Sequence, residues 1–276
     1  MGRWKMRNDV KMLLLLTIFI LTSVASGCAN STVTWSGKVE ESVIGAKSGS
    51  GELTSEIKSF ASKEFDSIRV NAEAMEIEVT RSSGHDAKVE LLTDKAIENQ
   101  FTFDAAIQSR ELIIRIDEEA KYYTIKGQRG ERKLRISLPD QIYGQVVIET
   151  QFGFVDAADL KARSVDIMLS AGEIRLNRVS GDLLLKTEAG KITALGIDPA
   201  NDISARTEAG DIDIVLDRSP KAVVVNLKSE LGSVSTNLKN MEYTVQSANQ
   251  IIATIGSNGT RIDAHAQVGD VLVHTK

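Results

Sequence analysis

The chain has 276 residues, of which 42% are apolar, and this is enough for one large or two small domains with a sizeable core. Its formal net charge is −5, and it becomes −8 without residues 1–27, which carry four basic residues and one acidic residue, a net +3. An acidic body without a basic run excludes nucleic acid as an expected partner, and a single cysteine excludes an internal disulfide.

The N-terminus, residues 1–27, has the three parts of a bacterial export signal: a basic start, an apolar run over residues 12–21, and the small residues at 25–27. That run is too short for a comfortable membrane span, which needs about 20 residues. The segment Ala25-Ser26-Gly27-Cys28 resembles a lipobox, although Ala25 stands where the motif usually has leucine. The resemblance implies that Cys28 is lipidated and begins the mature protein. An uncleaved signal anchor with an incidental thiol is the alternative, and both predict a body on the extracytoplasmic face of the cell membrane.

Residues 28–59 are polar and rich in serine, glycine, lysine and glutamate. Such a composition buries too little apolar surface to offset the entropy of ordering, so it predicts a flexible tether between the lipid and a folded domain at 60–276.

Alternating apolar and polar residues begin the folded domain, for example from Ile68 to Val79, and this period of two predicts half-buried β-strands. A clear strand at 134–138 is stopped by Pro139, which cannot donate to a β-ladder. We expect the strands of this N-terminal part to be antiparallel or irregular.

Residues 145–276 contain the clearest repeats. A phrase of one polar residue, two variable residues, glycine, one variable residue and Ile or Val begins at Thr150, Thr187, Thr207 and Ser229, and a weaker copy ends at Ile174. Its glycines recur at intervals of 18 to 22 residues, at Gly153, Gly172, Gly190, Gly210 and Gly232.

Self-similarity near twenty residues predicts an all-β fold, a single-stranded β-solenoid with rungs of about 20 residues, whose corners need the glycines. In that register Ile174, Ile192, Ile212 and Val234 stack in this order inside the coil. An antiparallel meander or sandwich would give similar spacing, but it would not need identical corners on one side.

The strand Arg135-Ile136-Ser137-Leu138-Pro139 ahead of the repeats and the Thr-Glu-Ala-Gly phrases at Thr187 and Thr207 resemble a known group. These are bacterial adhesin-like proteins of repeated β-strands, a domain family of unknown function that includes LiaG-like membrane-anchored proteins of envelope-stress operons. The resemblance covers roughly residues 65–276. It implies a fold and an envelope location, and the group has no catalytic signature to transfer.

The sequence offers no zinc, serine-hydrolase or nucleotide motif, and its three histidines, His85, His265 and His274, lie in separate segments. We therefore expect no catalytic residue, no metal site of a common type and no cofactor.

The remaining candidate site residues are Glu188, Glu208 and Glu230, each two residues before a glycine, which would stack about 4.8 Å apart in a solenoid. This acidic ladder would be a weak Ca²⁺ site, the acid pair of a glycan-cleaving enzyme, or an exposed hydrated row, and the last reading is favoured.

Two functions remain open. The favoured one is a non-enzymatic, surface-exposed lipoprotein that presents a face to another envelope protein, to the cell wall or to a host surface, or that assists an envelope-stress sensor. The alternative is a polysaccharide lyase or hydrolase built on a β-helix. Both tryptophans, Trp4 and Trp35, lie outside the repeats, which disfavours the aromatic platforms usual in sugar-processing clefts.

Overall fold

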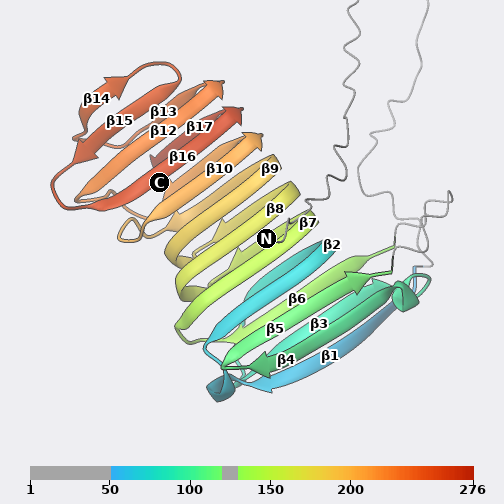
Figure 1. The fold of residues 1–276 in the computed structure, drawn as a ribbon. Helices are drawn as coiled ribbons and strands as arrows, with labels where there is room; N and C mark the ends of the chain where they lie inside the picture. Colours follow the sequence, from blue (N-terminus) through green and yellow to red (C-terminus); the bar gives the residue numbers. More distant parts are fainter. Residues whose placement is uncertain (1–50, 120–129) are drawn as a thin grey trace, which may run out of the picture. The chain divides into compact units, whose positions relative to one another are not determined.

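The computed structural model describes residues 51–119 and 130–276. These residues lie in one compact unit, Val43–Lys276, and form an all-β structure with 17 strands and two short 3-10 helices, η1 (Ser62–Glu64) and η2 (Glu98–Gln100). Within the described ranges, no helix is long and apolar enough to cross a membrane. The strands are shown in Figure 1.

The repeats form a stack of parallel strands. β7 (Tyr143–Ala158), β8 (Lys161–Asn177) and β9 (Ser180–Ile197) each bend at a glycine, and they pair in register so that Gly153, Gly172 and Gly190 face one another. Each strand therefore contributes to two faces, and the chain returns to the first face before the next strand begins (Figure 1). Parallel pairing is consistent with a β-solenoid-like coil and does not fit an antiparallel meander.

The next turn consists of β10 (Ile203–Ala209) and β11 (Ile212–Leu216), which pair in parallel with the two halves of β9. The order of the last two turns differs from the expected one. β16 (Thr260–Val268) and β17 (Val271–Thr275) insert between β10–β11 and the turn made of β12 (Val223–Leu231) and β13 (Val234–Thr236). The expectation that Val234 stacks on Ile212 is therefore wrong, because Val271 pairs with both.

The N-terminal part continues the same two faces. The halves of β2 (Ser67–Ser82) pair in parallel with β7, and on their other side with β5 (Glu111–Glu118) and β6 (Arg132–Pro139). The expectation of antiparallel or irregular strands in this part is therefore wrong for β2, β5 and β6 and holds only at the end of the stack. There β4 (Phe101–Gln108) pairs with β5, β3 (Asp86–Asp94) pairs with β6, and β1 (Leu53–Ala61) pairs with β3, all antiparallel. Residues 53–59, which composition places in the tether, are thus strand, because their backbone groups pair with those of β3.

The C-terminal end is closed in a similar way. β15 (Gln250–Ile255) pairs antiparallel with β12, and β14 (Glu242–Gln246) pairs antiparallel with β15. Leu238 is buried and Met241 packs against the core near the edge of these strands.

At the opposite end, β1 carries Lys58, whose Nζ donates to the Phe103 carbonyl oxygen at 2.6 Å and lies 4.3 Å from the centre of the Phe103 ring. An inward-pointing lysine on an edge strand discourages pairing with another chain.

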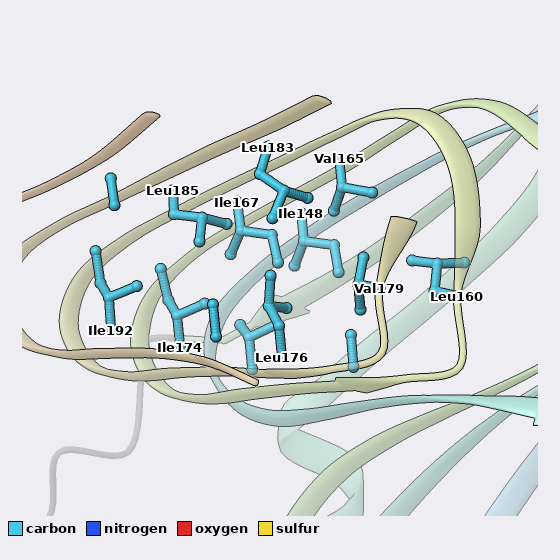
Figure 2. Close-up of a cluster of buried hydrophobic side chains, with 14 of the residues drawn as sticks. Ile148, Leu160, Val165, Ile167, Ile174, Leu176, Val179, Leu183, Leu185 and Ile192 are labelled. Atoms are coloured by element: carbon cyan, nitrogen blue, oxygen red, sulfur yellow. The ribbon is translucent and has the colours of Figure 1, made fainter. Parts of the chain in front are cut away.

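The core lies between the two faces of the coil. Side chains from both faces point into this space (Figure 2), and they stack from strand to strand, as in the columns Ile148–Ile167–Leu185 and Val155–Ile174–Ile192. These six side chains are fully buried. Burying an aliphatic side chain of this size stabilises the fold by about 1.5–3 kcal/mol, so the columns supply much of the cohesion between turns.

Candidate functional site

The glycines of the repeated phrase are required by backbone packing. Gly172 and Gly190 have φ angles of +139° and +149°, which L-residues with side chains rarely adopt. A Cβ on Gly190 would overlap the carbonyl oxygen of Gly172, and one on Gly172 would overlap that of Gly153. The glycine column therefore holds the turns in close contact and carries no reactive group.

The polar residue that opens the phrase also has a structural role. Thr207 Oγ1 donates to the carbonyl oxygen of Gly190 at 3.2 Å, and Ser229 Oγ donates to that of Gly269 at 2.7 Å. Both side chains are buried. The equivalent hydroxyl of Thr187 is buried without a hydrogen-bond partner within the described residues. Thr207 and Ser229 thus tie their corners to the adjacent turn.

Aspartates next to the glycines bind backbone amides across turns. The Oδ1 atom of Asp211 accepts a hydrogen bond from the Asp270 N–H at 2.9 Å, and the Oδ1 atom of Asp270 accepts one from the Ser233 N–H at 2.8 Å. Hydrogen bonds from the backbone and hydroxyl of Ser233 lower the pKa of Asp270 below its ordinary value. At the bend, these carboxylates accept hydrogen bonds from backbone N–H groups, which need a partner when they are not paired in the strand ladder. This structural role accounts for the two aspartates, and no ligand is needed to explain them.

The three glutamates predicted as a ladder are not consecutive. Glu188 and Glu208 lie on the adjacent strands β9 and β10, but β16 separates Glu208 from Glu230 and places Gln267 between them. Glu230 is 3.3 Å from the Nζ of Lys228 and 3.5 Å from the Nε2 of His265. The described residues contain no group of three or more His, Cys, Asp or Glu side chains placed to hold a metal ion. Cys28 lies outside the described residues.

A surface that sequence reasoning missed lies beside the glycine corner. The residue before each glycine points outward, and at this position Phe152, Val268 and Leu231 are exposed. Phe154, on the other side of Gly153, is also exposed. The sequence does contain large apolar residues directly before some repeat glycines, and these could have indicated an exposed apolar surface. The residue type at this position varies between copies, however, and it is alanine in the Thr-Glu-Ala-Gly copies.

A groove of about 540 Å³ opens next to this corner on the outer side of one face. We call it the carboxylate groove. It crosses five neighbouring strands, β5, β2, β7, β8 and β9, and contains four carboxylates, one lysine and several apolar side chains. Its acidic residues are Glu73, Asp117, Glu149 and Glu188, its basic residue is Lys186, and its apolar residues are Ala72, Ile116, Met168 and Leu169.

Of the three glutamates that the sequence predicts as site residues, only one lines the groove. Glu188 lines it, whereas Glu208 and Glu230 do not. None of the residues that line the groove is aromatic, cysteine or histidine. His274 instead lies 3.2 Å from Asp213, outside the groove, and the Nε2 atom of His265 lies 3.5 Å from Glu230. The arrangement offers charge and apolar surface for binding.

Comparisons with known proteins found one family model and several solved structures that are similar to the chain. A model of the family described as Toastrack DUF4097 matches residues 44–274. The chain is similar to the "putative cell adhesion protein" of Clostridium sporogenes ATCC 15579, with 12% identity, a TM-score of 0.52, and coverage of 82% of this chain and 100% of that chain. It is also similar to a "putative adhesin" of Bacteroides fragilis NCTC 9343, with 16% identity, a TM-score of 0.40, and coverage of 83% and 99%. No curated protein matches the chain.

Proposed function

Because the chain belongs to the Toastrack DUF4097 family, we propose that it is a non-enzymatic, adhesin-like binding protein of the bacterial envelope. Membership confirms the resemblance that the Arg135–Pro139 strand and the Thr-Glu-Ala-Gly phrases indicate. The proposal includes the finer description of the fold, a single-stranded β-solenoid with rungs of about 20 residues, which the parallel register of β7, β8 and β9 supports.

One observation carries the proposal. Polar side chains at the glycine corners join turns, as with Thr207, Ser229 and Asp211. Within the described residues, the side-chain carboxylates of the groove and the neighbouring Phe152 have no such role. An exposed apolar surface with polar surroundings is typical of an interaction site. We therefore assign binding to the groove and to the corner beside it.

The test is crosslinking of intact cells that express the full chain, followed by purification of the chain. A partner that is captured by the wild-type chain should be lost with Phe152→Ser/Met168→Ser and retained with Leu184→Ser/Val224→Ser. All four side chains are exposed, and the second pair lies outside the carboxylate groove. Equal capture by both variants would contradict the assignment of binding to this surface.

The proposed location is the extracytoplasmic face of the cell membrane, with a lipid on Cys28 as the anchor. The motif Ala25-Ser26-Gly27-Cys28 after an apolar run supports it. Cys28→Ala should abolish incorporation of labelled palmitate and release the chain from the membrane fraction. Undiminished labelling of the variant would contradict lipidation at this residue.

A glycan hydrolase or lyase is the second candidate, and the carboxylates of the groove are the observation in its favour, because such enzymes use paired acids. Release of new reducing ends from cell-wall or extracellular polysaccharide, lost with Glu149→Gln, would support it. Absence of release by the wild-type chain would leave binding as the function.

A further inference from the structure

The carboxylate groove differs from the opposite face of the coil in how its charges are balanced. On the opposite face, Glu76 and Glu78 lie 2.9 Å from the Nζ of Lys133, and Glu90 lies 2.8 Å from Arg135. Within the described residues, by contrast, none of the four groove carboxylates forms an ion pair, although Lys186 lines the same groove. The groove thus has a formal charge of −3 (four carboxylates and one lysine) that no ion pair among residues 51–119 and 130–276 balances.

A single metal ion does not fit this arrangement, because the described residues provide no cluster of three acidic, histidine or cysteine ligands. The charges are instead spread over five strands. At about 4.8 Å between strands, the four intervals span about 19 Å, which equals roughly six residues of extended peptide. Several separate cations on one chain match such a distribution better than one ion does.

The groove also has an apolar component. Met168 is 37% exposed within it, and Phe152, which is 54% exposed, lies beside its lining residue Gln151. A purely hydrophilic cationic ligand would leave this surface in water, whereas aliphatic side chains would bury it at a gain of about 25 cal/mol per Å².

We propose that the carboxylate groove binds a basic peptide segment that carries aliphatic side chains and belongs to another protein. Lysine or arginine side chains of the segment pair with Glu73, Asp117, Glu149 and Glu188, and its aliphatic side chains cover Met168 and Phe152. This inference rests on the proposed binding function and names the chemistry of the partner.

The experiment uses the full chain in phosphatidylcholine nanodiscs and a fluorescein-labelled octapeptide of alternating lysine and leucine, with empty nanodiscs subtracted. The wild-type chain should bind this peptide at least about tenfold more tightly than Glu149→Gln/Glu188→Gln does, because two unpaired charges are removed. Lys186→Gln should tighten binding about threefold, since it removes the one repulsive charge of the groove. The matched control is Glu64→Gln/Glu242→Gln, which removes two exposed glutamates elsewhere and should change binding less than about twofold.

Two comparison peptides separate the contributions. Alternating lysine and serine should bind at least about tenfold more weakly than lysine and leucine, and alternating glutamate and leucine should not bind measurably. Equal binding by the groove variant and the control, or equal binding of the serine and leucine peptides, would overturn the proposal. If the peptide fails but crosslinked capture still depends on Phe152 and Met168, the partner chemistry is wrong and the binding function stands. Failure of both would reject the binding function as well.

Discussion

Gly232 packs against Gly269, which comes later in the chain, and not against Gly210, the preceding glycine of the repeat. A Cβ on Gly232 would overlap the Gly269 carbonyl oxygen, and one on Gly269 would overlap that of Gly210. The C-terminal strands therefore fill a gap between two turns that follow one another in sequence. Spatial order departs from sequence order at this place, because β16 and β17 follow β12 and β13 in sequence but lie between them and β10–β11.

The first prediction concerns the glycine column. Gly190→Ala should lower the free energy of unfolding by at least about 2 kcal/mol, because the new methyl group meets the Gly172 backbone and φ is +149°. Urea denaturation followed by circular dichroism measures the loss.

Gly84→Ala is the matched control for this substitution. A Cβ at Gly84 has its nearest neighbour at 3.8 Å, so the change should stay within about 0.5 kcal/mol. Equal costs at the two sites would show that close contact between turns does not explain the glycines.

The second prediction tests the order of the turns. Ile212 and Val271 pair directly, whereas Ile212 and Val234 are separated by Val271. In double-mutant cycles with alanine, Ile212→Ala and Val271→Ala should couple by about 0.5 kcal/mol or more, while Ile212→Ala and Val234→Ala should be nearly additive. Each large-to-small change should itself be measurable, with about 2–5 kcal/mol expected for the isoleucine. Stronger coupling of Ile212 with Val234 would restore the sequential order.

Sequence periodicity predicts the glycine corners and the inward stacking of Ile174, Ile192 and Ile212, and the structure confirms these. It does not predict the inserted turn, for a physical reason. The phrase around Gly269 begins with Ala266 in place of a hydroxyl residue, so the copy is not recognised, yet Ala266 fits the column because its backbone still pairs on both sides. Strand order between turns depends on long-range pairing, which local patterns do not encode.

The candidate site was less predictable than the fold. Only Glu188 of the three proposed glutamates lines the groove, because the groove depends on which strands are neighbours. Its other carboxylates, Glu73, Asp117 and Glu149, lie in segments that no common motif connects. The contribution of β5 and β2 could not be inferred without their parallel pairing.

The third prediction compares two threonines in the same column. Thr207→Val should destabilise the protein by about 1–3 kcal/mol, because the Gly190 carbonyl oxygen loses the hydroxyl that it accepts from. Thr187→Val should be neutral or stabilising, since the Thr187 hydroxyl is buried and has no partner within the described residues. Urea denaturation of both variants measures the difference, and a loss at Thr187 equal to that at Thr207 would contradict it.

The last prediction concerns pH, and two aspartates should respond with opposite sign. Hydrogen bonds from Ser233 lower the pKa of Asp270, whereas burial is the main cause that raises the pKa of Asp156, and Arg175 opposes this rise. The lowered pKa means that the Asp270 carboxylate stabilises the fold above its unfolded pKa of about 3.9, and that this contribution is lost as pH falls through the folded value. The raised pKa means that ionised Asp156 destabilises the fold at neutral pH, and that this penalty disappears as pH falls through its folded pKa.

At about pH 7, Asp270→Asn should therefore unfold at lower urea concentration than the wild type and Asp156→Asn at higher concentration, and both differences should shrink by about pH 3. A shift of the same sign for both variants at neutral pH would mean that burial of Asp156 does not outweigh its attraction to Arg175.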